Sequence, residues 1–408
     1  MSNQIRLEQK RQNRVNNEDF IVVDAPFYGA DFVSCSYLIK KELVRFESLR
    51  ALCFFINKKP YSYPLSKNKV SFSASSFNSE YRAEVRELYT DYLFSIWVKC
   101  PSSLVDMKYY TNQMEQMSLA KRLISKACNI SMTDLEIYKK YAVSENRSAR
   151  NDFLSELKRL TVLNLIPNCF MAKLPYGEDK VISTITKGHI EEDYSKLLSG
   201  SLIIGSYIGN TDFRPVVSFK NSVNPSSKIF PLEIKPTVLS SIRELVKTEN
   251  ISDSGMSIIY KVPSSNSQQM FLLNMIFKLG IGSLFFERGI SLIDSSVFHR
   301  AGVVVFFFAG NDRCFSEKEK ERMLDRIQAG ITEKSFFDNS KLELLYRLSE
   351  NLSPYQRTER EIQSRLLGVN LGKNVLLSSL EKITSDTFQA YIKEVSYYGS
   401  LILNGEEK

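Results

Sequence analysis

The sequence predicts an α+β protein made of two homologous domains of about 200 residues, each an antiparallel sheet backed by helices. The chain has 408 residues, and at roughly 100 to 200 residues per domain this length favours more than one domain. Hydrophobic residues make up 43% and charged residues 25%, which is ordinary for a globular protein with a buried core. The third observation is a pattern that recurs about half the chain length apart.

The recurring pattern combines apolar residues with a threonine at helical spacing. The copies are Ile182, Ile185, Thr186 and Ile190 in the first half, and Leu380, Ile383, Thr384 and Phe388 in the second. In each copy the threonine can begin a helix, because its hydroxyl can accept a hydrogen bond from a backbone N–H of the first turn. Gly-Ser-Leu-Ile follows each copy, at residues 200–203 and 399–402. A helix leading into a strand is therefore predicted twice, which indicates a duplicated domain.

The predicted boundaries are a polar tail at residues 1–19, a first domain at 20–215, a linker at 216–236 and a second domain at 237–408. The linker region contains Asn224-Pro225 and little regular pattern. In the first domain, β-branched and aromatic residues predict strands at 20–23 and 31–39 and, by their alternation, at 88–99. Helices are predicted over residues 47–57, 114–129, 132–143 and 149–164.

The second domain repeats this order. Strands are predicted at residues 257–262 and 301–309, and a helix at 268–279 between them. Residues 303–308 are all apolar, as in a strand buried on both faces. Ser316 and Glu319 form a capping box that begins a helix through Gln328, and Ser340 with Glu343 predicts the start of another.

Charge and composition exclude several classes of function. The net charge of +8 comes from 54 basic and 46 acidic residues that are spread along the chain, so no nucleic-acid surface is expected, whereas an acidic peptide partner is compatible. No apolar stretch reaches the 18 residues of a membrane span, and no secretory signal is present at the N-terminus, so a cytoplasmic protein is expected. Six cysteines without a C-x-x-C pair and only two histidines exclude Cys and His metal clusters. His299 has no nucleophile nearby in sequence, so a catalytic role for it is not expected.

Several segments resemble one enzyme family. They are Leu-Pro-Tyr-Gly at residues 174–177, the Thr186 helix with Tyr194, the strand ending in Gly209, and Gly-Ser-Leu-Phe-Phe-Glu-Arg-Gly at 282–289. Together they resemble the pitrilysin-like, or inverzincin, zinc metallopeptidases, which include the mitochondrial processing peptidases. The resemblance runs from about residue 20 to the C-terminus and implies two domains of the same fold.

The chain departs from this family at the metal site. The family's H-x-x-E-H sequence lies on the first helix, where two histidines hold zinc and the glutamate acts as general base. Leu49, Leu52 and Cys53 occupy the His, Glu and His positions. One cysteine alone cannot hold catalytic zinc. Arg288 matches an arginine that such peptidases use on substrate, but Leu292 stands where a tyrosine is expected.

The resemblance therefore implies a catalytically inactive subunit of a heterodimeric peptidase, without a cofactor of its own. It would help to bind a peptide precursor for a homologous partner chain that carries zinc. This chain resembles the AlbE-like subunits that take part in bacteriocin maturation, and this resemblance favours a role in leader processing of a ribosomally made peptide. The alternatives are a stand-alone or homodimeric peptide-binding scaffold, a relative of the peptidase-like proteins associated with elongation-factor P modification, or an unrelated enzyme.

Overall fold

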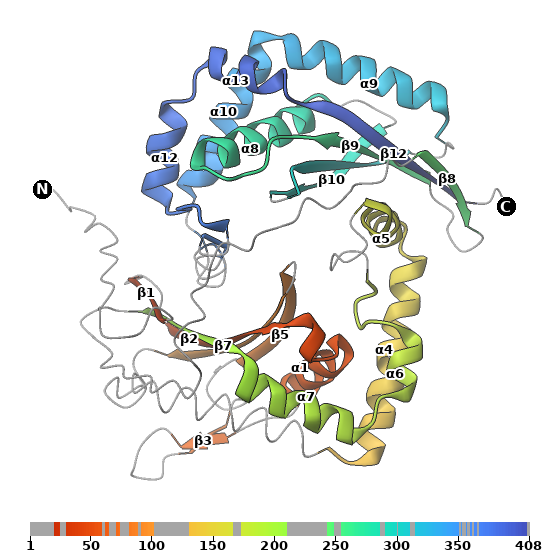
Figure 1. The fold of residues 1–408 in the computed structure, drawn as a ribbon, viewed down its shortest axis with the longest axis vertical. Helices are drawn as coiled ribbons and strands as arrows, with labels where there is room; N and C mark the ends of the chain where they lie inside the picture. Colours follow the sequence, from red (N-terminus) through yellow and green to blue (C-terminus); the bar gives the residue numbers. More distant parts are fainter. Residues whose placement is uncertain are drawn as a thin grey trace, which may run out of the picture. The chain divides into compact units, whose positions relative to one another are not determined.

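The computed structural model describes most of the chain in two compact units. The described residues are 20–24, 30–58, 62–64, 71–73, 81–88, 91–101, 130–165, 173–209, 243–248, 254–285, 290–299, 301–310, 315–350 and 367–405, with 352, 356, 360, 363 and 364. Each unit combines a five-stranded sheet with helices (Figure 1). The predicted α+β fold of two similar domains is thereby confirmed.

The two sheets have the same strand order. The first is β1 (Phe20–Asp24), β7 (Leu202–Gly209), β2 (Ala30–Lys40), β6 (Asp91–Pro101) and β5 (Tyr81–Leu88). The second is β8 (Arg243–Thr248), β12 (Ser396–Gly405), β9 (Ser254–Lys261), β11 (Val303–Gly310) and β10 (Ile290–Phe298). In both, the described pairs are antiparallel except the first, β1 with β7 and β8 with β12, which are parallel. The sheets are thus mainly rather than purely antiparallel.

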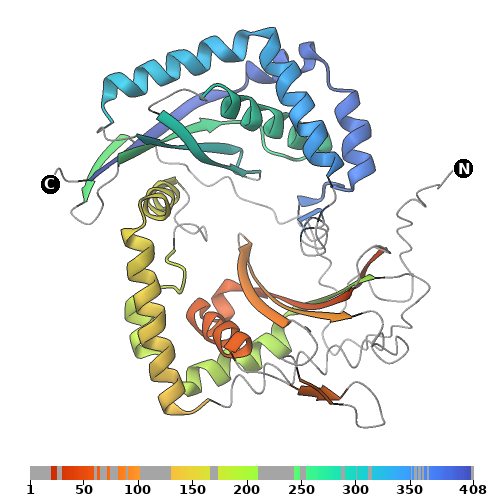
Figure 2. The ribbon, with the colours of Figure 1, turned by 180° about the vertical axis from the view of Figure 1, so that it is seen from behind.

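Helix α1 (Phe46–Lys58) packs against β5 in the first unit. This unit also contains the short helix η1 (Lys41–Leu43), α6 (Asp179–Thr184), α7 (Lys187–Gly200), most of α4 (Met132–Asn151) and the separate hairpin of β3 (Ser62–Pro64) and β4 (Ser71–Ser73). Figure 2 shows α1, α4 and α7 from behind. Leu49, Leu52, Phe94 and Tyr138 are completely buried between these elements.

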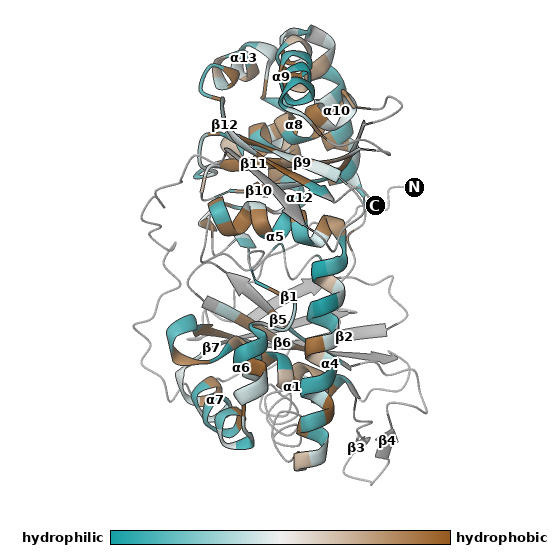
Figure 3. Ribbon diagram, turned by 90° about the vertical axis from the view of Figure 1, so that its right-hand side faces the viewer, coloured by the Kyte–Doolittle hydropathy of each residue, from teal (hydrophilic) through white to brown (hydrophobic). Residues whose placement is uncertain are grey.

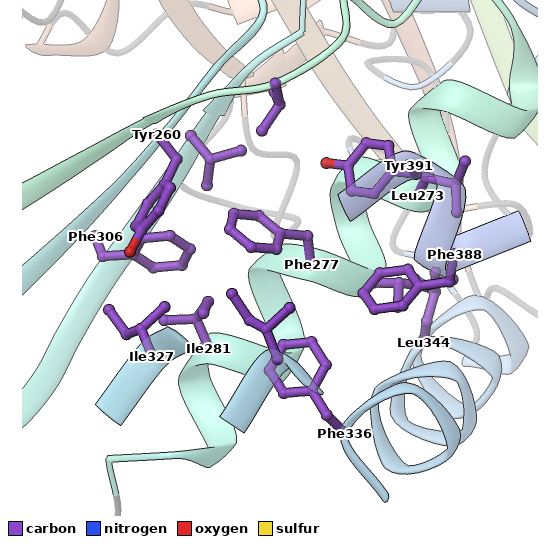
Figure 4. Close-up of a cluster of buried hydrophobic side chains, with 14 of the residues drawn as sticks. Tyr260, Leu273, Phe277, Ile281, Phe306, Ile327, Phe336, Leu344, Phe388 and Tyr391 are labelled. Carbon is purple, nitrogen blue, oxygen red and sulfur yellow. The ribbon is translucent and has the colours of Figure 1, made fainter. Parts of the chain in front are cut away.

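Both faces of the second sheet are covered. Helix α8 (Gln268–Ser283) lies on one face with α9 (Glu317–Thr332), α10 (Lys334–Ser349), α12 (Lys373–Glu381) and α13 (Ser385–Ile392). Figure 4 shows Phe277, Phe306 and Phe388 at the centre of this core. Helix α5 (Phe153–Leu165) covers the other face, and Figure 3 colours several turns of its ribbon as hydrophobic. Residues 303–308 are consequently all buried, as predicted for a strand covered on both faces.

The side-chain caps explain where several helices begin. Thr186 accepts a hydrogen bond from the His189 backbone N–H at 3.2 Å, and Thr384 accepts one from Thr387 at 3.2 Å. The predicted capping box of Ser316 is also present. The predicted helix start at Ser340 is wrong, because this residue lies inside α10 and its hydroxyl bonds the Phe336 carbonyl of the preceding turn.

Other predicted elements differ in their bounds. The single strand predicted at 88–99 corresponds to two strands in the structure, namely the last residue of β5 and most of β6. The prediction merged them because it read one alternating pattern through both. Strand β10 was not predicted. The proposed tail, the linker at 216–236 and the helix at 114–129 lie outside the described residues. The domain boundaries stay predictions, and the compact units do not follow chain order, since residues 147–174 group with the second unit.

In the described part of the chain, no helix combines the length and apolar character that crossing a bilayer requires.

Candidate functional site around helix α1

The face of α1 that carries the three predicted metal-site positions points into the core. Leu49 and Leu52 have no exposed surface, and Cys53 is 5% exposed. Burial raises the pKa of the Cys53 thiol to about 12, so it stays a neutral thiol rather than a metal-binding thiolate. The described residues contain no group of three His, Cys, Asp or Glu side chains that could hold a metal ion. This face of α1 therefore packs as an ordinary apolar helix face.

A buried glutamate next to this face holds a tight turn. Glu47 is 8% exposed, and its Oε1 accepts a hydrogen bond from the Glu178 backbone N–H at 3.0 Å. Gly177 precedes Glu178 with a φ of 90°, a conformation that favours glycine. A Cβ atom on Gly177 would lie 2.2 Å from the Glu47 Oε1. The Glu47 carboxylate thus occupies the space that any side chain larger than hydrogen would need at position 177.

Helix α4 holds the same turn from its other side. Asn146 is completely buried, and its Nδ2 donates to the Gly177 carbonyl at 2.9 Å and to Asp179 Oδ1 at 2.7 Å. Its Oδ1 accepts a hydrogen bond from the Tyr176 backbone N–H at 3.1 Å. The turn of the Leu-Pro-Tyr-Gly segment is therefore fixed by α1 and α4 together, and this fixes where Tyr176 lies.

Tyr176 joins an aromatic cluster between α1 and α4. Its ring centroid lies 5.6 Å from that of Tyr141 and 6.3 Å from that of Tyr138, with the rings edge to face. Tyr138 also contacts Phe54 and donates its hydroxyl to the Glu47 carbonyl at 3.2 Å. Burial raises the pKa of both Tyr138 and Tyr176, so their hydroxyls remain protonated donors.

Arg50 lies at the border of this cluster, one residue after the first predicted metal position. Its guanidinium carbon is 5.1 Å from the Phe46 ring centroid and 5.9 Å from the Tyr176 ring centroid. The Nε atom is buried and has no hydrogen-bond partner among the described residues. We call Phe46, Arg50, Tyr141 and Tyr176 the Arg50 patch. Sequence reasoning missed it, and the only signal was a basic residue within the apolar run 49–56.

The N-terminal end of α1 is anchored separately. Asp193 on α7 is 1% exposed and accepts hydrogen bonds from Arg45 Nη1 at 3.0 Å and from the Ser48 hydroxyl at 2.5 Å. Desolvation lowers the pKa of Arg45, but the hydrogen bonds and charges of Asp193 and Glu192 together outweigh it and raise this pKa above its usual value. Arg45 thus has a carboxylate partner, whereas the part of the chain that the structure describes provides none for Arg50.

In the second unit, His299 lies next to the hydroxyl of Ser265, a neighbour that is too distant in sequence to be predicted. Its Nδ1 lies 2.7 Å from the Ser265 hydroxyl, which also accepts a hydrogen bond from Asn274 Nδ2 at 2.9 Å. The Asn274 Oδ1 accepts the Tyr391 hydroxyl at 2.7 Å. With Asn274 oriented in this way, the Ser265 O–H is left to donate to Nδ1, which places the imidazole proton on Nε2. Ser265 is only 4% exposed, so this network stabilises the fold and does not offer a nucleophile to a substrate.

The other residues singled out in the sequence, Arg288 and Leu292, and the second histidine, His189, do not come together in a binding site among the described residues. Arg288 lies outside the described residues. Leu292 begins the bulged part of β10 and packs against the core of the second unit. His189 completes the capping box of α7, since its Nδ1 accepts the Thr186 N–H at 3.4 Å.

Comparisons with known proteins support the fold. No protein-family profile matches the chain, and no curated protein sequence matches it. Solved structures do match along almost the whole chain: a conserved protein from Enterococcus faecalis has a TM-score of 0.67 at 13% identity, covering 95% of this chain and 96% of that one. The M16 peptidase inactive domain from Pseudomonas fluorescens has a TM-score of 0.66 at 10% identity, covering 97% of both chains. A chain of complex III2 from Candida albicans has a TM-score of 0.67 at 12% identity, covering 95% and 93%.

These similarities define a class of fold. The chain has the two-domain fold of the M16, or pitrilysin-like, peptidases and their inactive relatives. The resemblance expected from Leu-Pro-Tyr-Gly and the Thr186 helix is confirmed at the level of the fold.

Proposed function

We propose that this chain is a catalytically inactive, peptide-binding subunit that works with a zinc-bearing chain of the same fold. One observation carries the proposal: Leu49, Leu52 and Cys53 are packed into the core on the helix that bears the metal site in active members. A buried apolar face cannot bind zinc or activate a water molecule. A chain that keeps the peptidase fold without this chemistry retains the capacity to bind and orient a peptide.

The finer part of the proposal concerns the pathway. The partner would carry H-x-x-E-H and the zinc, and the two chains would together process a peptide precursor, such as the leader of a ribosomally made peptide or bacteriocin, in the cytoplasm. The C. albicans complex shows that a chain of this fold can be part of a larger assembly.

A stand-alone or homodimeric peptide-binding scaffold is the second candidate. The Arg50 patch favours it, because a fixed positive charge between aromatic rings can bind a peptide group without a metal.

A processing assay tests the subunit. The assay uses a homologue that carries H-x-x-E-H and a candidate precursor peptide, both sought among the genes adjacent to this one. The homologue is purified alone and mixed with this chain, and cleavage of the precursor is followed by mass spectrometry. We expect processing to increase with added chain until the two are equimolar. Replacing the general-base glutamate of the partner by glutamine is the control and should abolish cleavage. Equal processing with and without this chain would exclude the subunit function, and precursor binding by this chain alone would then favour the scaffold.

A further inference from the structure

We infer that the Arg50 patch binds a carboxylate of a peptide, either its free C-terminus or an Asp or Glu side chain. The inference rests on the proposed peptide-binding function and names the chemical group that is recognised. It follows from the unused donors of Arg50, from the fixed position of its ring neighbours and from the charge of the patch.

The first argument is the absence of an internal partner. A guanidinium carries five N–H donors, and leaving buried donors of a charged group unpaired is costly. Within the described part of the chain, the buried Nε of Arg50 has no hydrogen-bond acceptor. Two other partly exposed arginines behave differently: Arg45 pairs with Asp193, and Arg159 bonds Glu156 through both Nε and Nη2. The carboxylate of Glu47, on the preceding turn of α1, is already engaged by the Glu178 N–H.

The second argument is that the patch is organised before a ligand arrives. Phe46 and Tyr176 contact the guanidinium within 6 Å of their ring centroids, a distance at which the ring faces attract a cation. Tyr176 is itself held by the Gly177 turn, so little ordering is required on binding. Arg50, Tyr141 and Tyr176 are partly buried, and an ion pair is stronger at a partly buried position than in bulk water.

The third argument concerns the charge of the ligand. The patch holds one positive charge, and its other polar groups are the Tyr141 and Tyr176 hydroxyls, which lie 3.5 Å apart. Because burial raises the pKa of Tyr176, this phenol stays neutral and does not repel an anion. One forked cation beside neutral O–H groups matches a planar carboxylate with a single negative charge. The net charge of +8 would attract acidic peptides towards the chain.

Binding of three matched peptides tests the inference. They are ten-residue peptides of Gly, Ser and Ala with a neutral fluorophore at the N-terminus: one with a free C-terminal carboxylate, one amidated, and one amidated with a central Glu. Fluorescence anisotropy with the full chain should show at least one carboxylate peptide binding about tenfold or more tightly than the neutral peptide. The peptide that gains affinity identifies the source of the carboxylate.

Variants separate recognition by Arg50 from a general charge effect. Arg50→Met keeps the length of the side chain and should remove the tenfold preference, whereas Arg347→Met, which removes an exposed charge on α10, should keep it. Tyr176→Phe keeps the ring against Arg50 and covers the case in which Arg50→Met fails to fold; the preference should persist, weakened by a few fold.

Three outcomes would overturn the inference. They are equal binding of all three peptides, a preference that survives Arg50→Met, and the absence of any peptide binding. Equal binding would leave the proposed peptide-binding function intact, and the processing assay with the zinc-bearing partner decides that function independently.

Discussion

Asn57 and Ala83 form two reciprocal hydrogen bonds between the C-terminal end of α1 and the edge strand β5. Asn57 Nδ2 donates to the Ala83 carbonyl at 2.9 Å, and the Ala83 N–H donates to Asn57 Oδ1 at 2.7 Å. The Ala83 N–H and carbonyl group bond the Asn57 side chain instead of β6. These two groups therefore point away from β6, towards the edge of the sheet. The Asn57 amide thus takes the position of a peptide group from an additional strand and closes the β5 edge at this residue.

We expect Asn57→Ala to lower the free energy of unfolding by about 1 to 2 kcal/mol, because two hydrogen bonds to a partly buried backbone are lost. Urea unfolding measures this change, and hydrogen exchange should show faster exchange of the Ala83 amide. The open edge should also increase self-association in size-exclusion chromatography. Asn151→Ala, at the exposed end of α4, is the control and should change neither property. Unchanged exchange at Ala83 would contradict this interpretation of the edge.

Gly177→Ala should destabilise the first unit by about 2 kcal/mol or more, since a residue with a Cβ is strained at this φ and would collide with Glu47. Gly188→Ala in α7 is the matched control. Among the described residues its Cβ would have only the Thr186 hydroxyl nearby, at 3.8 Å, so a gain of up to about 1 kcal/mol from helix propensity is expected. Thermal unfolding of both variants measures the difference. If the two substitutions had the same effect, the turn would not be held as described.

Leu52→Glu restores a carboxylate at the position of the lost general base and tests whether this face of α1 belongs to the core. Leu52 has no exposed surface, so burying a charge there should cost about 3 kcal/mol or more, and zinc should not restore stability. Leu342→Glu on α10 is the control, because Leu342 is 65% exposed and the change should be small. Chemical unfolding with and without zinc, together with metal analysis, provides the measurement. Stabilisation of Leu52→Glu by zinc would show that a metal site remains.

Local patterns in the sequence predicted much of the fold. The caps at Thr186, Thr384 and Ser316 and the apolar helix at 47–57 depend on neighbours a few residues away, and all four are present. The duplication followed from the same local signals. Strand β10 escaped prediction because polar residues, such as Asp294 and Ser295, interrupt its apolar pattern at a bulge.

The candidate site could not be predicted, because long-range contacts create it. Tyr176 reaches α1 only after Asn146 and Glu47 fix its turn, and these residues are far apart in sequence. The Ser265–His299 contact likewise joins residues 34 positions apart, so no local pattern indicated it. The absence of a zinc site stays a prediction from the sequence, since the residue types at 49, 52 and 53 supply no imidazole ligand wherever the helix lies.

His299 should make the stability of the second unit depend on pH. Burial and, to a smaller extent, the nearby charge of Lys278 together lower its pKa from 6.5 to about 4. The unfolded chain therefore binds a proton more readily than the folded chain between these values. The contribution of the neutral, buried His299 to the free energy of unfolding is therefore fully present above pH 6.5 and is lost as the pH falls towards 4.

The loss at pH 4 should reach up to about 3 kcal/mol, the free energy that corresponds to this pKa difference. Protonation would also place an N–H on Nδ1 facing the Ser265 hydroxyl, so the chain of hydrogen bonds to Asn274 would have to rearrange. Urea unfolding at several pH values between 7 and 4 measures the slope. In His299→Asn, where an amide oxygen can still accept the Ser265 hydroxyl, the dependence on pH should be flatter because no imidazole titrates. His189→Asn leaves the buried imidazole in place and should keep the steeper slope of the unmodified chain. Equal slopes in all three proteins would mean that acid acts on stability through other groups.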